Sequence, residues 1–238
     1  MAGLAATEVM LRAYEEDPGT FVCPLMVEVN DTDVTDWLLV LNESPVKTVA
    51  DLKGKTVGSH PGTAVPNVMK AALRANGVDP ASVKIEPKSP ETQAESLLSG
   101  AVDALICLEP TGTRLQLTGK CRVLMRHPFG AVERAFPASY AVLSKTFVKK
   151  HPAASKRLLA VITEAVNAYR KQGASDRAVL DGLVSERLDL EPEVAARSSL
   201  VTYRLPDEWD EDIFKRTIKF YTDLGILSKP ITIADIKP

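Results

Sequence analysis

The spacing of apolar residues predicts strands that alternate with helices through the first 144 residues. The helix predicted for residues 64–76 has its apolar side chains at i, i+3, i+4, i+7 and i+8, which is the one-sided pattern of an amphipathic helix: Val65, Val68, Met69, Ala72 and Leu73. Short apolar runs bounded by turn residues predict strands. These strands cover residues 21–29, 36–43, 55–59, 83–88, 102–108, 121–127 and 138–144.

Helical patterns lie between these strands and fill most of the remaining chain. Thr7 is the expected N-cap of a first helix that reaches Glu16. Ser89-Pro90 begins another helix, which Gly100 closes. Further helices are expected at 152–172, 176–188, 191–199 and 208–224. Strands that alternate with helices of this length predict βαβ units and a mostly parallel sheet, and therefore an α/β protein.

The same alternation divides the chain into two lobes. Residues 46–137 form a self-contained βαβαβαβ set, which we expect to fold as lobe 2. The flanking segments 1–45 and 138–238 are expected to pack together as lobe 1. Two segments would then cross between the lobes, near 41–47 and 128–140, and small-molecule sites lie at such interfaces.

Composition and charge argue against several classes of protein. The 238 residues are 45% hydrophobic and 25% charged, and 29 Lys and Arg nearly balance 31 Asp and Glu, so no nucleic-acid footprint is present. No apolar run reaches the roughly 18 residues of a membrane span. The chain contains no GxSxG, HExxH, P-loop or GxGxxG motif, and we expect no cofactor.

Cysteine and histidine positions argue against a metal centre. The cysteines are odd in number and far apart, which predicts small core residues rather than disulfides: Cys23, Cys107 and Cys121. The histidines lack carboxylate or cysteine neighbours at ligand spacing: His60, His127 and His151. We therefore expect no metal site.

Four segments, taken in order, resemble a known family. They are DLKGKTVGSHPGTAVPNVMKAALRANGVDP (51–80), AESLLSGAVDALICLEP (94–110), FVKKHPAASKRLLAVITEAVNAY (147–169) and DLGILSKPITIADI (223–236). Together they resemble the substrate-binding proteins of the nitrate/sulfonate/taurine class, a group that includes binders of thiamine precursors and that serves ABC importers. The resemblance covers nearly the whole chain, and it implies a type II periplasmic-binding-protein fold with two lobes.

This resemblance also implies partners and a location. A small-molecule ligand and the membrane permease of an ABC importer are the expected partners, and the full-length parent is expected to be periplasmic or lipid-anchored outside the cytoplasm. GLAATEVML (3–11) resembles a segment that follows about two βα units in the family, each roughly 30 residues. We expect those units and a signal peptide to be missing here. The incomplete first lobe is then expected either to be marginally stable or to self-associate through the region around residues 1–45.

The turn Ser59-His60-Pro61-Gly62-Thr63 is the main candidate for ligand contact. Parallel α/β units bind ligands at the carboxyl ends of their strands, where this turn lies. Gly62 lets a ligand approach the backbone closely, Thr63 can cap the helix or turn its hydroxyl outward, and the helix N-terminus favours an anion. A plain connection is the alternative from spacing alone, but this loop contacts ligand in the family that the chain resembles.

Three further residues are candidates, each with a structural alternative. Glu109 ends a buried strand and could accept hydrogen bonds from a ligand or hold the lobes together, or it could be a solvated acid. Thr7 begins the first helix and resembles the opposite wall of the cleft, or it is an ordinary N-cap. Tyr140 follows the second crossing, where it could cover a ligand, or it is a core tyrosine. Trp37 is expected in the core.

Binding and catalysis remain open on this fold. The first hypothesis is a solute-binding protein that captures a small anionic or zwitterionic solute. The second is an enzyme similar to the chorismate-dehydrating or pyrimidine-precursor-synthesising relatives. Only Glu109 and His60 are titratable groups near the proposed cleft, which favours binding without chemistry. A ligand-sensing domain of a regulator would need an upstream DNA-binding segment.

Overall fold

The chain folds into two compact units in a computed structural model that describes residues 2–62 and 64–238. Unit 1 consists of the residues up to Glu28 together with Ala135–Leu180 and Thr202–Pro238. Unit 2 consists of Val29–Arg134 and Asp181–Val201. The chain therefore passes between the units four times, at residues 28/29, 134/135, 180/181 and 201/202.

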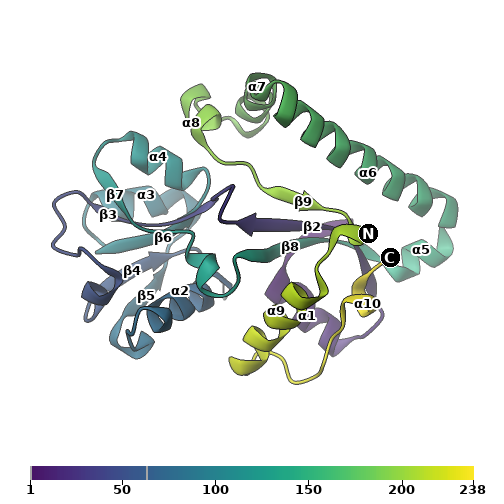
Figure 1. Ribbon diagram of the computed structural model, residues 1–238, viewed down its shortest axis with the longest axis horizontal. Coiled ribbons are helices and arrows are strands. Elements are labelled where there is room, and N and C mark those ends of the chain that lie inside the picture. The colour runs from purple at the N-terminus through teal and green to yellow at the C-terminus, as the bar shows by residue number, and fades with distance from the viewer. Residues whose placement is uncertain (1, 63) are drawn as a thin grey trace. The chain divides into compact units, whose positions relative to one another are not determined.

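Unit 2 is built on a five-stranded sheet in the order β5-β4-β6-β3-β7 (Figure 1). Its strands are β3 (Asp36–Leu41), β4 (Thr56–Ser59), β5 (Lys84–Pro87), β6 (Ala104–Leu108) and β7 (Cys121–Arg126). Strand β4 pairs in parallel with both β5 and β6, as the βαβ pattern predicts. Strand β3 runs antiparallel to both β6 and β7.

The helices of unit 2 bury one face each. They are α2 (Ala64–Ala75), α3 (Pro90–Leu98), α4 (Thr111–Leu117) and α8 (Pro192–Arg197), with short 3-10 helices η1 (Val49–Leu52), η2 (Pro80–Ser82) and η3 (Pro128–Ala131). The predicted apolar face of α2 is confirmed, since Val68, Met69, Ala72 and Leu73 are completely buried. Under α3 and α4, Leu39, Leu97, Leu105 and Leu115 form part of one core cluster.

Unit 1 is built on a sheet in the order β1-β8-β2-β9. Its strands are β1 (Ala2–Ala6), β2 (Phe21–Asn30), whose last two residues belong to unit 2, β8 (Ala135–Ser144) and β9 (Thr202–Arg204). Strand β1 pairs antiparallel with β8, and β9 pairs antiparallel with β2. Helices α1 (Thr7–Glu16) and α9 (Glu211–Asp223) both pack against β8.

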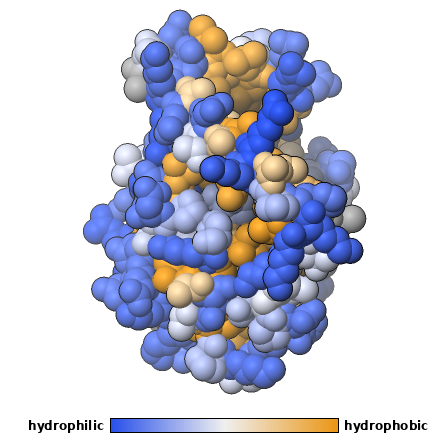
Figure 2. Space-filling model, turned by 90° about the vertical axis from the view of Figure 1, so that its right-hand side faces the viewer, coloured by the Kyte–Doolittle hydropathy of each residue, from blue (hydrophilic) through white to orange (hydrophobic). Residues whose placement is uncertain are grey.

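The remaining helices of unit 1 come from the second half of the chain. They are α5 (Lys145–Lys150), α6 (Pro152–Ser175), the 3-10 helix η4 (Pro206–Glu208) and α10 (Ile233–Ile236), while α7 (Arg177–Leu188) continues from unit 1 into unit 2. On the face drawn in Figure 2, hydrophobic residues reach the surface in several places between hydrophilic ones. Among the described helices, none combines the length and the apolar character that crossing a bilayer requires.

The structure differs from the sequence-based expectation in two respects. The expectation of a mostly parallel sheet is wrong for β3, which begins opposite the end of β6, where Asp36 pairs with Leu108, and therefore runs in the reverse direction. The division of the chain also differs. Residues 29–45 lie in unit 2, because β3 is the fourth strand of that sheet, and residues 181–201 return to unit 2 instead of staying with the C-terminal helices.

Candidate functional site

The loop after β4 lies at the carboxyl edge of the unit 2 sheet. Ser59 is the last residue of β4, and it pairs with Ile106 of β6 and Pro87 of β5. Its side chain is completely buried, and its Oγ lies 3.4 Å from the carbonyl oxygen of His60. The His60 ring is half-buried, and its Nδ1 lies 2.9 Å from the carbonyl oxygen of Pro61.

Gly62 gives this loop a backbone conformation that other residues rarely adopt. Its φ is +99°, and a side chain built there would meet no atom within 4 Å, so the backbone of this exposed residue is open to an approaching group. Thr63, the other candidate in the loop, lies outside the described residues. Helix α2 begins at Ala64, and the first turn of any helix has backbone N–H groups without intrahelical acceptors.

Glu109 makes a set of hydrogen bonds within unit 2. Its Oε1 accepts from Trp37 Nε1 at 2.8 Å and from Thr113 Oγ1 at 2.9 Å, and its Oε2 accepts from Thr113 N at 3.0 Å. Ser198 Oγ lies 3.5 Å from Oε2. The Glu109 carboxylate thus binds the first turn of α4 and the indole of Trp37 in β3, so both of its oxygens already have protein partners.

The Trp37 indole also explains a glycine in α4. A Cβ on Gly112 would lie 2.1 Å from Trp37 Cδ1, so no larger residue fits unless the indole moves. Trp37 is only partly buried, but it packs against the core cluster of unit 2 as the sequence predicted. The hydrogen bond between Trp37 and Glu109 could not be predicted from local sequence patterns, because the two residues are 72 positions apart.

A buried Asp–His pair lies at the start of β3. Asp36 is completely buried, and its Oδ1 is 2.8 Å from His127 Nδ1, while its Oδ2 accepts from Phe129 N at 2.9 Å. His127 Nε2 lies 3.2 Å from the carbonyl oxygen of Arg134. Burial lowers the pKa of His127, but the hydrogen bond and the negative charge of Asp36 outweigh burial, and the net pKa is raised.

Sequence reasoning missed this pair because Asp36 and His127 are 91 positions apart. Both ring nitrogens of His127 have partners, and Gly130 leaves space for the ring, since a Cβ there would lie 2.7 Å from His127 Cδ2. The pair therefore fixes the 3-10 helix η3, which packs against α2. Within the described residues, no cluster of three His, Cys, Asp or Glu side chains could hold a metal ion.

Thr7 and Tyr140 lie in unit 1. Thr7 contacts β8, and Tyr140 belongs to that strand. The expectation that Thr7 is the N-cap of α1 is wrong: Ala6 holds that position, and the buried Thr7 hydroxyl donates to the carbonyl oxygen of Pro137. Tyr140 is 1% exposed and packs edge-on against Trp209, with ring centroids 5.3 Å apart. It also lines a cavity of about 270 Å³ within unit 1.

The candidate residues therefore fall into two sets. Ser59, His60, Gly62 and Glu109 belong to unit 2, where Ser59 is the last residue of β4 and Glu109 follows the neighbouring parallel strand β6. Thr7 and Tyr140 belong to unit 1. The polar side chains of Thr7 and Glu109 bind groups of the protein that are distant in sequence, whereas those of Ser59 and His60 have partners within their own loop.

Comparison with known proteins finds a family match and curated relatives. The family model described as "NMT1/THI5 like" matches residues 27–173. A curated protein of Escherichia coli (strain K12), named "Putative aliphatic sulfonates-binding protein", is 29% identical over 143 residues. That match covers 60% of this chain and 44% of the relative, so it spans less than half of the relative's length.

Solved structures match the chain along its whole length. The periplasmic aliphatic sulphonate binding protein SsuA from Escherichia coli has a TM-score of 0.76 at 21% identity, and the match covers 100% of this chain and 75% of that chain. The desulfurization enzyme DSZB has a TM-score of 0.73 at 18% identity, with 99% of this chain and 82% of that chain covered. These likenesses show the fold, which is the type II periplasmic-binding-protein fold.

Proposed function

The chain belongs to the family described as NMT1/THI5 like, and from that membership we propose that it is a solute-binding protein. It captures a small anionic or zwitterionic solute for ABC-type import. The matched segment, residues 27–173, contains the whole of the sheet of unit 2 and the loop that follows β4. The relatives named above as sulfonate-binding proteins support an aliphatic sulfonate as the first solute to test.

The observation that carries this proposal is the open backbone at Gly62. The loop from Ser59 to Gly62 leads from a parallel strand into α2, a helix of 12 residues. The positive end of a helix dipole attracts anions, and the exposed glycine lets a sulfonate or carboxylate come close to the main chain. His60 is half-buried in the same loop, whereas the side chain of Ser59 is completely buried.

Glu109 has a different role in this proposal. Its two carboxylate oxygens hold α4 and Trp37, so we assign it to the support of the strand ends rather than to the solute. Release of the solute to a membrane permease, and a location outside the cytoplasm, follow from the proposed role. Binding then shifts the population of conformations and makes no covalent bond.

The enzyme alternative finds less support in the side chains. DSZB has a similar fold, so the fold alone does not separate binding from catalysis. All three cysteines are buried, and burial raises the pKa of Cys23 to about 12 and also raises that of Cys121. Cys23 and Cys121 are therefore protonated thiols at neutral pH and do not act as thiolate nucleophiles. The His127 ring has a protein partner at each nitrogen.

Titration calorimetry with ethanesulfonate and butanesulfonate tests the proposal, with the matching carboxylates for comparison. Gly62→Ala should weaken sulfonate binding roughly tenfold, a change of about 1.4 kcal/mol. Gly54→Ala is the matched control, because Gly54 also has positive φ, +76°, and open space around it. Both variants should lose about 1 kcal/mol of stability from backbone strain.

Three results would count against the proposal. They are the absence of saturable binding to any sulfonate, an equal loss of affinity in Gly62→Ala and Gly54→Ala, and a new product in mass spectra after incubation with the sulfonates. The last result would favour an enzyme on the same fold.

A further inference from the structure

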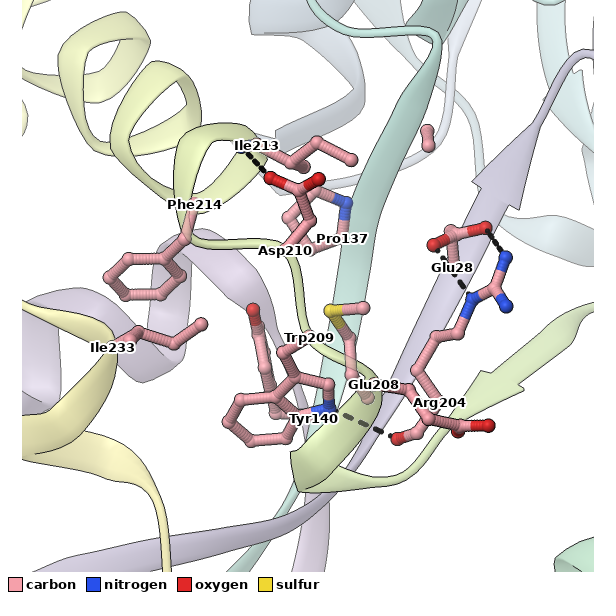
Figure 3. Close-up of a pocket in the computed structure, with 12 residues that line it drawn as sticks. Glu28, Pro137, Tyr140, Arg204, Glu208, Trp209, Asp210, Ile213, Phe214 and Ile233 are labelled. Carbon is pink, nitrogen blue, oxygen red and sulfur yellow. Dashed lines mark hydrogen bonds and ion pairs between the residues drawn. The ribbon is translucent and has the colours of Figure 1, made fainter.

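A cavity of about 270 Å³ lies within unit 1, between β2, β8, β9 and the start of α9 (Figure 3). Aromatic and aliphatic side chains form much of its wall: Met26, Tyr140, Trp209, Ile213, Phe214 and Ile233. Ala135 and Pro137 also line it, together with the charged residues Glu28, Arg204, Glu208 and Asp210. The wall therefore combines apolar side chains with charged ones, and polar atoms contribute more of its exposed surface than apolar atoms do.

Tyr140 brings an unpartnered polar group into this cavity. The residue is 1% exposed, and its hydroxyl has no hydrogen-bond partner among the described residues. Figure 3 shows the hydroxyl at the end of the ring that points away from the strand, toward the space beneath Asp210. Burial raises the pKa of Tyr140, so the phenol stays neutral and can both donate and accept a hydrogen bond. The Tyr140 oxygen is not one of the fully buried unpartnered atoms of the described residues, so it is accessible in the cavity, where a water molecule or a ligand can bond to it.

Most of the other polar groups of the cavity already have partners in the protein. Arg204 binds Glu28 through two hydrogen bonds of 3.0 and 2.8 Å. Glu208 binds Arg170 through two hydrogen bonds of 2.9 and 2.7 Å. The Trp209 indole donates to the carbonyl oxygen of Arg204 at 3.1 Å. The two ion pairs neutralise themselves, so they leave one charged side chain of the wall without an ion pair, while the positive charge of Lys237 lies outside the wall against Trp209.

That remaining side chain is Asp210. Its Oδ1 caps α9 by accepting from Asp212 N at 2.8 Å and from Ile213 N at 2.9 Å. Its Oδ2 has no hydrogen bond or ion pair among the described residues. The carboxylate is therefore a negative charge at the cavity with a free acceptor. On the aromatic side, Lys237 Nζ lies 5.8 Å from the centre of the Trp209 ring, so this ring already attracts one cation.

We propose that the unit 1 cavity binds a small molecule that carries a protonated amine, with Asp210 and the Tyr140 hydroxyl as its polar contacts. An ammonium group donates hydrogen bonds and has a positive charge, so it satisfies the Tyr140 lone pairs and the free Asp210 oxygen together. A carboxylate or sulfonate would be repelled by Asp210. This inference goes beyond the proposed function, because it rests on unit 1 alone and needs neither the Ser59–Gly62 loop nor a sulfonate.

NMR titration of the full chain labelled with [¹³C-methyl]methionine tests the site. Met26 lines the cavity and is one of five methionines, and Met26→Leu identifies its signal. The probes are n-butylammonium, butan-1-ol and butanoate, which share a chain and differ in charge. We expect butylammonium to shift the methyl signal of Met26 in a saturable way. Its affinity should be about tenfold tighter than that of butan-1-ol. Butanoate should not saturate the site.

Two conservative variants test the two contacts. Tyr140→Phe removes only the hydroxyl, and Asp210→Asn removes the charge while keeping a good N-cap residue. Each should weaken butylammonium binding about fivefold or more. Tyr221→Phe is the matched control, because Tyr221 is equally buried in unit 1 but does not line the cavity, and it should leave the affinity unchanged.

Stability measurements separate a ligand contact from a structural one. Because the Tyr140 hydroxyl lacks a partner in the protein, Tyr140→Phe should be at least as stable as the unaltered chain. No saturable shift at Met26, equal binding of butan-1-ol and butylammonium, or unchanged affinity in Tyr140→Phe and Asp210→Asn would each overturn the proposal. The first of these results would mean that the cavity holds water only.

Discussion

Glu109→Gln tests whether the carboxylate of Glu109 supports the fold of unit 2 or faces a solute. Glutamine keeps the shape of the side chain and one acceptor oxygen, which can still accept from Trp37 Nε1 and Thr113 Oγ1, the bonds of 2.8 and 2.9 Å. Its amide nitrogen would face Thr113 N, a donor that now bonds Oε2 at 3.0 Å. One bond is thus lost, and two bonds lose their charged acceptor.

The expected loss of stability follows from these three bonds. Bonds to charged groups contribute about 1.5–3 kcal/mol each, and bonds between neutral groups contribute about 1 kcal/mol. Glu109→Gln should therefore lower the free energy of unfolding by about 2 kcal/mol, and Glu109→Ala, which removes every bond, by about 4 kcal/mol. For a chain of this size, a loss of about 2 kcal/mol lowers Tm by roughly 4–8 °C.

Thermal unfolding can be followed at Trp37 in a Trp209→Phe background, so that the fluorescence reports unit 2 alone. Thr113→Val removes one partner, and its combination with Glu109→Gln should be less damaging than the sum of the single changes. Glu43→Gln, an exposed change in unit 2, is the control and should change Tm little. A Glu109→Gln variant that is as stable as the unaltered chain but loses sulfonate affinity would refute the supporting role.

Two further predictions concern unit 2. Gly112→Ala should lower its stability by about 1–3 kcal/mol and shift the Trp37 emission, because the new Cβ would collide with the indole; unchanged emission and Tm would contradict this packing. The raised pKa of His127 means that the Asp36–His127 pair stabilises the fold fully below about pH 6.5 and that this contribution is lost as the pH rises through the raised value. The urea midpoint of the unaltered chain should therefore exceed that of His127→Gln by less at about pH 9 than at about pH 6. A difference that does not change with pH would contradict the conclusion that His127 is charged in the pair.

Local patterns along the sequence predicted many of the elements of the fold. Residues 64–76 show their apolar face plainly, and α2 forms at Ala64–Ala75 with that face buried. Strand β6 is predicted at 102–108 and is found at Ala104–Leu108 for the same reason. In both cases the signal lies within the element itself, so no knowledge of distant neighbours is needed.

The missed features depend on residues that are far apart in the sequence. An apolar strand such as β3 fits either direction in a buried sheet, and its pairing with β6 and β7 decides that it runs antiparallel. The partners of Thr7, Glu109 and His127 lie 130, 72 and 91 positions away. Residue type alone suggested that Thr7 is an N-cap, that Glu109 is a ligand acceptor and that His127 is an isolated histidine. The long-range contacts instead show that Thr7 and His127 contribute to the packing of their own units.

The four passages of the chain between the units also set an order of assembly during synthesis. All five strands of unit 2 lie between Asp36 and Arg126, so a nascent chain can pair them once that stretch has left the ribosome. The sheet of unit 1 must join Ala2 to Leu143 and Met26 to Arg204, and the entropy of closing such long loops delays both pairings. Until β9 emerges, β2 has an open edge that a folding chain or a chaperone can occupy. Translation speed near residue 204 therefore bears on the yield of unit 1 far more than on that of unit 2.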